Sequence, residues 1–349
     1  MKKTILFRVD SSVEIGEGHI SRCLALAEQI KNVNIIFISK NISKNYLKKI
    51  KKNNFKILLF DNSKITKNND KIFPEHKIII ELLKEKKIIP DLLIVDNYKI
   101  DYKWESKLKQ YVKNIVVIDD LIEKKHNCDI LINQNILKSQ YKKYDGLIPK
   151  NCKKLFGPNY VILRNEFIKN RKKIKIRKII KKIIISFGSS DPKNETLKVI
   201  NAIKDLKNIE VDVVVGDINP NKKYLKNKCE IMNNFKFHLQ TDKISILMKK
   251  ADFAIGAAGS SSWERCCLGL PSIVTVLSKD QFLVAHNLEL LNASINLGIS
   301  ERITKDTYKE AIKSLNPTKI KKMSENSMKI VDGMGSFRIA NEIKKLLGE

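Results

Sequence analysis

The sequence predicts an α/β protein built from two doubly wound parallel sheets. Short runs of Ile, Val, Leu and Phe alternate with longer amphipathic stretches along the chain. Near-continuous apolar runs bounded by turn residues are typical of parallel strands buried on both faces. Helices between such strands make βαβ units. The length of 349 residues is about twice that of an ordinary domain, which indicates two domains.

The expected strands form two series. In the first half they are residues 5–9, 34–39, 56–60, 92–96, 115–119 and 130–133, and in the second half 183–187, 210–215, 236–239, 253–256 and 272–276. The stretch 165–182 between the series is highly charged and lacks a strand pattern, so we place the junction there. The expected domains are residues 1–170 and 171–349. A final helix at about 336–347 follows a glycine-bearing turn and can cross back to the first domain.

The formal charge of +29 suggests a nucleic-acid binder, but the distribution of the basic residues does not favour one. A nucleic-acid binder clusters its basic residues or shows a known module, whereas Lys is scattered here over nearly every predicted helix and loop. Lys, Ile and Asn share A/T-rich codons, so genomic base composition explains the charge. The alternative is a surface that attracts phosphate-bearing ligands or acidic lipids. We expect no nucleic-acid partner.

Features of export or membrane insertion are also missing from the sequence. No apolar run approaches the roughly 20 residues of a membrane helix, and the first apolar stretch is closed by Arg8 and Asp10, unlike a signal peptide. None of the six cysteines stands in a C-x-x-C pair, so a zinc or redox site has no support. Reduced thiols fit a cytoplasmic protein. We expect a cytoplasmic monomer without stable membrane insertion.

The first candidate site follows the first strand, where Asp10, Gly16, Gly18 and His19 lead into a helix. The glycines allow a sharp turn and close approach of a ligand, but they lack the third glycine of a dinucleotide fingerprint. The helix dipole disfavours a charged imidazole there, and a general base requires a neutral one. His19 is either such a base or a structural cap, and the residues alone leave both open. Asp10, Gly16 and Gly18 are expected to bind substrate.

The second candidate site is a loop of small residues that leads from a strand into a helix. Backbone N–H groups, the hydroxyls of Ser260 and Ser261 and the helix dipole can converge there on an anion, with Gly259 allowing close approach. Each hydrogen bond to a charged oxygen contributes roughly 1.5–3 kcal/mol, so a few of them can hold a diphosphate without a metal. The serines can equally be helix caps. Glu264 can accept two hydrogen bonds from a ribose diol, or be an ordinary first-turn acid.

A third turn and several absent motifs complete the chemistry of the sequence. Gly188 and Ser189 follow the first strand of the second half, as a phosphate-facing turn or a plain helix start with Pro192 near its first position. No D-x-D pair is present, so we expect no metal and no cofactor. A P-loop and a G-x-S-x-G elbow are also absent, which argues against a P-loop NTPase and an α/β-hydrolase.

Several segments, in order along the chain, resemble the UDP-sugar hydrolases of pseudaminic acid biosynthesis (PseG). The most specific match is residues 256–271, with the run Trp263-Glu264-Arg265-Cys266-Cys267-Leu268-Gly269-Leu270-Pro271. The other matching segments are residues 7–24, Val95-Asp96-Asn97-Tyr98, Ile118-Asp119-Asp120, His126-Asn127-Cys128-Asp129, residues 157–164, and Asp332-Gly333-Met334-Gly335 with Arg338. These segments span nearly the whole chain.

The resemblance implies a fold and a reaction. The fold is GT-B, in which two Rossmann-like domains face a central cleft, as in the GlcNAc transferase of lipid II synthesis. The reaction is hydrolysis of UDP-2,4-diacetamido-2,4,6-trideoxy-β-L-altrose to UDP and the free sugar. The bond broken is the sugar C1–O bond, with inversion and without a metal.

The resemblance also assigns roles to individual residues. His19 matches the catalytic histidine of the family, Tyr98 its active-site tyrosine and Glu264 its ribose-binding acid. Gly259, Ser260 and Ser261 match the residues that face the diphosphate, and Gln281 lies where GT-B enzymes of this type contact the donor. Asn97 departs from the pattern, because some members have His there, and this puts a second-histidine role in doubt.

Three other functions remain open from the sequence. A GT-B glycosyltransferase would pass the sugar to an acceptor instead of water, and its lipid-using forms should show an exposed apolar patch on the first domain. A UDP-sugar 2-epimerase would need carboxylates lining the sugar pocket. A non-enzymatic nucleic-acid binder would show steeply salt-dependent binding.

Overall fold

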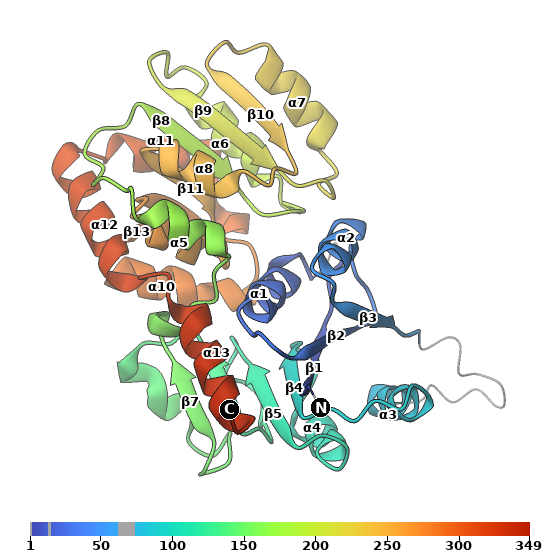
Figure 1. Ribbon diagram of the computed structural model, residues 1–349. Coiled ribbons are helices and arrows are strands. Elements are labelled where there is room, and N and C mark those ends of the chain that lie inside the picture. The colour runs from blue at the N-terminus through green and yellow to red at the C-terminus, as the bar shows by residue number, and fades with distance from the viewer. Residues whose placement is uncertain (1, 13–14, 62–73) are drawn as a thin grey trace. The chain divides into compact units, whose positions relative to one another are not determined.

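Two parallel sheets organise the chain in the computed structural model, which describes residues 2–12, 15–61 and 74–349 (Figure 1). Contacts divide the chain into two compact units. The first unit comprises Met1–Ile162 and Ser336–Glu349, and the second comprises Leu163–Gly335. Each unit contains one of the sheets.

The described part of the first unit holds a seven-stranded parallel sheet in the order β3-β2-β1-β4-β5-β6-β7. Its strands are β1 (Thr4–Val9), β2 (Asn34–Ser39), β3 (Lys56–Leu59), β4 (Leu92–Asp96), β5 (Asn114–Ile118), β6 (Ile130–Asn133) and β7 (Lys153–Phe156). In register, Phe7 of β1 pairs with Phe37 of β2 and with Ile94 of β4. The order is that of a doubly wound Rossmann sheet.

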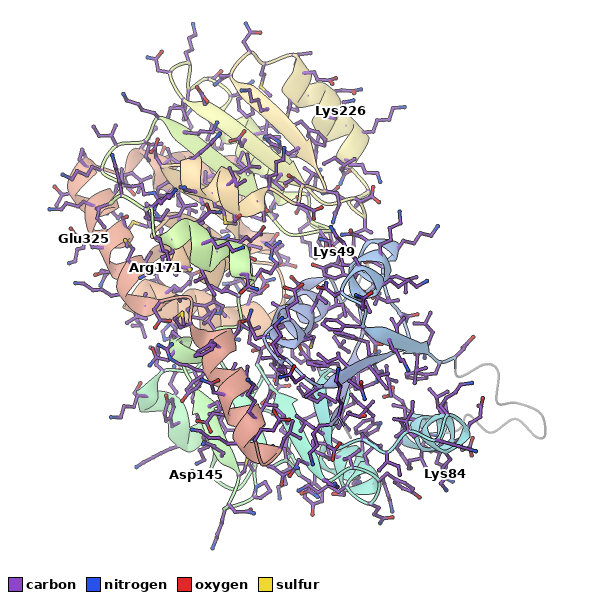
Figure 2. All side chains as sticks on the ribbon, viewed as in Figure 1. Lys49, Lys84, Asp145, Arg171, Lys226 and Glu325 are labelled. Atoms are coloured by element: carbon purple, nitrogen blue, oxygen red, sulfur yellow. The ribbon has the colours of Figure 1, made fainter. Side chains whose placement is uncertain are left out.

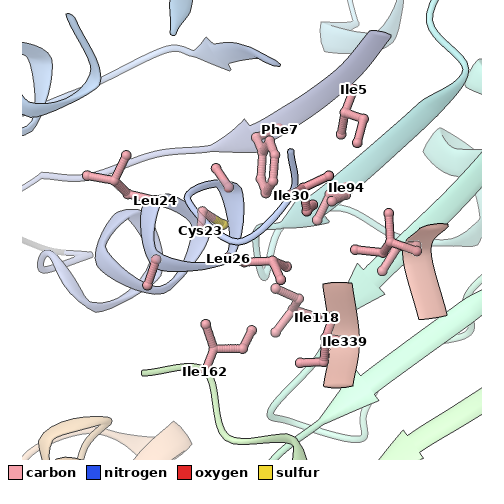
Figure 3. Close-up of a cluster of buried hydrophobic side chains, with 14 of the residues drawn as sticks. Ile5, Phe7, Cys23, Leu24, Leu26, Ile30, Ile94, Ile118, Ile162 and Ile339 are labelled. Carbon is pink, nitrogen blue, oxygen red and sulfur yellow. The ribbon is translucent and has the colours of Figure 1, made fainter. Parts of the chain in front are cut away.

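Helices cover both faces of this sheet. They are α1 (Gly18–Ala27), α2 (Lys44–Lys52), α3 (Glu75–Glu85), α4 (Tyr102–Leu108), α13 (Gly335–Leu346) and the 3₁₀ turns η2 (Lys138–Tyr144) and η3 (Pro158–Tyr160). Ile5 and Phe7 of β1 point into a core shared with α1, α2 and α13, while Leu6 points into a second core with α3 and α4. Figure 3 shows the first of these cores. Burial on both faces explains the near-continuous apolar strands.

The second unit holds a six-stranded parallel sheet in the order β10-β9-β8-β11-β12-β13, within the described residues. Its strands are β8 (Lys182–Ser186), β9 (Glu210–Val215), β10 (Phe235–Leu239), β11 (Phe253–Ala257), β12 (Ser272–Val276) and β13 (Ser294–Ile299). Gly256 of β11 pairs with Ser186 of β8. A Cβ on Gly256 would lie 2.1 Å from the Ser186 carbonyl oxygen, so only glycine permits this approach.

Helices surround the second sheet as well. They are α5 (Asn165–Arg171), α6 (Glu195–Ile203), α7 (Lys222–Glu230), α8 (Ile244–Lys250), α9 (Ser261–Cys267), α10 (Phe282–Leu290), α11 (Lys305–Lys313), α12 (Pro317–Ile330) and the 3₁₀ turns η4 (Lys279–Gln281) and η5 (Ser300–Arg302). Helices α6, α7 and α11 contribute Val199, Leu225 and Tyr308 to one core. Helix α12 packs on α9, and α5 packs on α8 and α9.

The structure confirms the fold class and every strand expected from the sequence, within a residue or two at the ends. It adds two edge strands that the sequence analysis missed. Strand β7 is four residues long and begins with two exposed lysines, Lys153 and Lys154. Strand β13 contains Asn296 and Gly298 and is mostly half-buried. An edge strand is covered less completely than a central one, so its apolar pattern is weaker.

The C-terminal helix α13 belongs to the first unit. Its residues Ile339, Ala340 and Ile343 are buried in the core that contains β1 and β5. Figure 3 shows Ile339 beside Ile118. The units meet in sequence at Ile162 and Leu163, so α5, which the sequence analysis placed at the end of the first domain, packs in the second.

Lysines stand on separate helices of both units, as Lys49, Lys84 and Lys226 illustrate (Figure 2). These three belong to α2, α3 and α7. The distribution follows the scattered pattern of the sequence. In the described residues, no helix combines the length and the apolar character needed to cross a membrane.

Candidate active site

Both candidate sites lie at the points where the strand order of a sheet reverses. In the first sheet β1 lies between β2 and β4, and in the second β8 lies between β9 and β11. Ligands of open parallel sheets bind outside the carboxyl ends of the strands at such switch points. His19 lies on the helix that follows β1, and the small-residue loop with Gly259 follows β11.

In the first unit, His19 forms a buried pair with Asp96. Helix α1 begins at Gly18, so His19 is in its first turn, and its Nδ1 lies 2.6 Å from Oδ1 of Asp96 at the end of β4. His19 is 9% exposed and Asp96 is 1% exposed. The imidazole is engaged by Asp96, and within the described part of the chain no side-chain hydrogen bond caps the start of α1. The contact therefore disfavours the capping role that the sequence left open.

Arg22 keeps Asp96 ionised. Burial of Asp96 would by itself raise the pKa of its carboxyl, but the charge and hydrogen bonds of Arg22, with the hydrogen bond from His19, hold this pKa well below its usual range. Arg22 donates through Nε to Oδ2 and through Nη2 to Oδ1, each at 2.6 Å. An ionised carboxylate only accepts hydrogen bonds, so Nδ1 of His19 is the donor. In the neutral imidazole the lone pair is then on Nε2.

The network extends from Arg22 to Asp120, Tyr98 and Asn135. Arg22 Nη1 donates to Oδ2 of Asp120 at 2.6 Å, and the Tyr98 hydroxyl donates to the same oxygen at 2.9 Å. Asn135 donates to Oδ1 of Asp120 at 2.7 Å. The Tyr98 ring meets the His19 ring edge-on, with centroids 4.5 Å apart. The structure thus brings Tyr98 and His19 together.

The remaining predicted residues of this unit shape the loop around His19. Asp10 accepts hydrogen bonds from Asn97 at 2.9 Å and from the backbone N–H of Lys40 at 2.7 Å, and it pairs with Arg8. Through these contacts Asp10 connects the loops that follow β1, β2 and β4. Gly16 has a φ of +76°, which favours glycine, and its N–H donates to the Ser12 carbonyl. Residues 13 and 14 lie outside the described part of the chain.

In the second unit, a buried arginine lies under the small-residue loop. Arg265 is 1% exposed, and its Nη2 donates to the Ala257 carbonyl at 2.8 Å and to Ser262 Oγ at 2.7 Å. Nη1 donates to Ser261 Oγ at 3.2 Å. Burial lowers the pKa of Arg265 to about 10, so the guanidinium stays charged at neutral pH. The loop therefore rests on a fixed positive charge that favours an anion.

Two other predicted residues flank this loop. Gln281 accepts the Leu277 N–H through Oε1, and its Nε2 would lie 3.5 Å from a Cβ on Gly259. Glu264 Oε1 accepts from Arg164 Nη2 at 2.9 Å. Gly259, Gln281 and Glu264 thus lie around the start of α9, with Ser260 as the residue before the helix.

The third predicted turn lies at the other strand of the same switch point. Gly188 follows β8 with a φ of +85°. The backbone of Ser189 passes close to Gly216 at the end of β9, because a Cβ on Gly216 would lie 2.3 Å from the Ser189 carbonyl oxygen. Asp191 accepts the N–H groups of Glu195 and Thr196, each at 2.9 Å, and so fixes the start of α6.

Comparison with known proteins places the chain in a family. No protein-family model matches it. It is 32% identical over 266 residues to the UDP-2,4-diacetamido-2,4,6-trideoxy-β-L-altropyranose hydrolase of Campylobacter jejuni, covering 73% of this chain and 85% of that protein. The chain belongs to this hydrolase family. The family is the one that the sequence resemblance indicated.

Two further relatives extend the comparison. The spore coat polysaccharide biosynthesis protein SpsG of Bacillus subtilis is 26% identical over 97% of this chain and 96% of its own length. An uncharacterized protein of Methanocaldococcus jannaschii is 34% identical over 76% of this chain, which spans about half, 54%, of that longer protein.

Solved structures show the same fold at low sequence identity. MurG of Acinetobacter baumannii matches 98% of this chain and 99% of its own with a TM-score of 0.69 and 13% identity. MnaA of Staphylococcus aureus, solved with UDP, matches 99% of this chain and 97% of its own with a TM-score of 0.63 and 15% identity. The family member described here therefore has the GT-B fold.

The sequence analysis missed the charged residues that hold the site residues in place. Asp96 and Asp120 follow apolar runs at the ends of neighbouring strands, β4 and β5. An acid at that position in two adjacent strands was a usable signal, because the carboxyl ends of parallel strands share one edge. Arg22 is three residues after His19 and so on the same helix face. Arg265 had no comparable signal, since its burial depends on the loop folding over it.

Proposed function

We propose that this chain hydrolyses UDP-2,4-diacetamido-2,4,6-trideoxy-β-L-altrose, breaking the sugar C1–O bond with inversion and without a metal, in pseudaminic acid biosynthesis. At a coarser level, family membership supports an enzyme that acts on a UDP-sugar. A Helicobacter pylori relative, 26% identical over 68% of this chain, carries the same hydrolase name together with pseudaminic acid cytidylyltransferase. The observation that carries the proposal is the buried His19–Asp96 pair at the switch point of the first sheet.

The first unit supplies the base. Nε2 of His19 takes a proton from water, and the resulting hydroxide attacks C1 on the face opposite UDP. Asp96 accepts the hydrogen bond from Nδ1–H, fixes the ring orientation and, staying ionised, stabilises the imidazolium that forms. Tyr98 packs edge-on against the same ring and limits its rotation. A positioned general base contributes on the order of 10²–10⁴ in rate.

The second unit supplies the nucleotide site. The diphosphate rests on Gly259, Ser260 and Ser261, with Gln281 beside them and the Gly188–Ser189 turn at the neighbouring strand end. The positive charge of Arg265 under this loop stabilises the negative charge that grows on the departing diphosphate. Because these groups are already fixed in the fold, they stabilise the leaving group without reorganisation.

The function is tested by UDP release from a panel of UDP-sugars, without acceptor and with EDTA present, followed by NMR. We expect rapid release of UDP from the diacetamido-trideoxy-altrose donor, with the inverted anomer of the sugar appearing first. A UDP-sugar that binds but is cleaved only after an acceptor is added would replace hydrolysis with glycosyl transfer. That alternative is kept because structures with this fold include glycosyltransferases. Loss of release in EDTA would overturn the metal-free mechanism.

Glu264→Gln tests the ribose contact. We expect UDP affinity to fall about tenfold or more, because a hydrogen bond to a charged group contributes roughly 1.5–3 kcal/mol. Affinity for 2′,3′-dideoxy-UDP should be the same in the variant and the parent protein, since that ligand lacks the diol. Calorimetry measures both. Glu166→Gln, which alters another carboxylate paired with Arg164, is the matched control and should leave UDP affinity unchanged.

A further inference from the structure

We infer that His126 is a positioning residue: through residues 119–126, here called the clamp loop, it holds Tyr98 against His19. The catalytic consequence rests on the proposed function, but the structural coupling does not.

The clamp loop forms hydrogen bonds with both the side chain and the backbone of Tyr98. Asp120 accepts the Tyr98 hydroxyl at 2.9 Å, and Lys124 donates through Nζ to the Tyr98 carbonyl at 2.6 Å. The Tyr98 ring, which lies between the hydroxyl and the backbone held in this way, makes its edge-on contact with His19. A shift of the loop therefore moves Tyr98 relative to the base.

The loop is tightly turned at its beginning. Asp119 accepts the N–H groups of Leu121 at 3.0 Å and Ile122 at 3.1 Å, and it accepts the Tyr144 hydroxyl at 2.7 Å. Ile122 has a φ of +60°, which a β-branched residue rarely adopts. Such a conformation persists only where the surroundings hold it, so the loop depends on its anchors.

His126 is the anchor at the other end of the loop. Its Nδ1 lies 2.7 Å from Oε1 of Glu105 on α4, and its Nε2 lies 3.9 Å from Oδ2 of Asp119. The residue is 5% exposed, and its buried Nε2 has no hydrogen-bond partner among the residues that the structure describes. The ring lines a small cavity that Tyr98 also lines. An imidazolium here presents one N–H to each carboxylate and ties α4 to the start of the loop.

The charge of His126 is sensitive to pH. Burial opposes the charged form, but the hydrogen bond and charge of Glu105 and the charge of Asp119 outweigh it, so the pKa of His126 is raised. Lys124 opposes the rise, and Glu123 is the other charged group that lines the cavity. Because the pKa of His126 is raised in the folded protein, the stability that its charge contributes to the fold is complete below the ordinary pKa near 6.5. This contribution is lost as pH rises through the raised pKa.

The coupling is tested first on the unaltered protein, without substrate. NMR of the His126 ring should show titration with a midpoint above 6.5. The backbone amide signals of Leu121, Ile122 and Tyr98 should change with the same midpoint. A Tyr98 amide that does not follow the His126 titration would overturn the inference, whatever reaction the chain catalyses.

The catalytic consequence is tested with His126→Asn, whose side-chain amide can still donate to Glu105 but carries no charge. We expect kcat at neutral pH to fall about 10- to 100-fold, because small misplacements of active-site groups have effects of this size. The KM should change little. In the wild-type enzyme, kcat should fall as pH rises through the His126 titration. This fall should be absent from the variant.

The control is His238→Asn, which removes the histidine of a comparable pair with Asp212 in the second unit. It should keep the wild-type rate and pH profile. A His126→Asn enzyme with the wild-type profile would overturn the inference while leaving the proposed function intact. If the wild-type protein releases no UDP from any donor, the proposed function fails, and the NMR titration still decides the coupling.

Discussion

His19→Asn should lower kcat by about 10²–10⁴ while UDP affinity stays at the wild-type level. The range is what a positioned general base contributes. UDP affinity is kept because the proposed nucleotide contacts, such as Gly259 and Glu264, belong to the second unit, whereas His19 belongs to the first. The measurements are steady-state release of UDP from the altrose donor and calorimetric titration with UDP. His19→Gln should behave in the same way.

The matched control is His76→Asn, which changes a histidine on α3 of the same unit outside the His19–Asp96 network. Its turnover should equal that of the parent protein. A His19→Asn enzyme with full activity would remove His19 as the base and leave the fold and family unaffected. A variant that has lost UDP binding as well would point to a contact of His19 with the nucleotide.

Arg22→Met should destabilise the fold by about 3–5 kcal/mol at neutral pH, because it leaves two buried carboxylates without the positive charge that compensates them. The Asp96 side chain is fully buried and that of Asp120 nearly so. Arg22 itself is 6% exposed, and although burial opposes its charge, Asp120 and Asp96 raise its pKa well above the usual value. Methionine fills a similar space without a charge. Urea unfolding followed by circular dichroism measures the loss.

The pH dependence of this variant has a defined sign. In the wild-type protein the lowered pKa of Asp96 contributes stability above its ordinary value, and that contribution is lost as pH falls. Without Arg22, burial raises the pKa of Asp96, so the variant gains stability as pH falls and Asp96 takes up a proton. The difference between the two proteins should therefore shrink between pH 8 and pH 5, about the range over which such buried carboxyls titrate.

A triple variant supplies the control for Arg22→Met. Adding Asp96→Asn and Asp120→Asn removes both uncompensated charges, so much of the lost stability should return at neutral pH. If the difference between Arg22→Met and wild type is equal at pH 5 and pH 8, the loss comes from packing and not from the buried charges.

The local pattern of the sequence was enough for the central part of the fold. Strand β4 is a run of apolar residues that ends in Asp96, and both of its faces are buried, so the strand is visible without any partner. Strand β7 begins with exposed Lys153 and Lys154 at the edge of the sheet, and its pairing with β6 is a long-range property. The return of α13 to the first unit is also long-range, since any amphipathic helix can cover either sheet.

The candidate site shows the same division between local signals and long-range contacts. His19, Gly259 and Glu264 were identifiable because their signals are local: a glycine loop or a small-residue loop at a strand-to-helix turn. The partners that set their chemistry lie far along the chain. Asp96 is 77 residues from His19, and Arg164 is 100 residues from Glu264. Their identities are visible in the sequence, but their contacts are not.

By itself the sequence determined the fold class, the two strand series and the family, and it singled out His19 as a candidate base, since the signal for each lies in short segments of the chain. Only the tertiary structure decided the orientation of that histidine. Nδ1 became the donor because β4 places Asp96 beside α1, and Arg22 holds the carboxylate ionised. The physical reason is that hydrogen bonding and buried charge depend on distance in space, and chain folding sets that distance independently of separation in sequence.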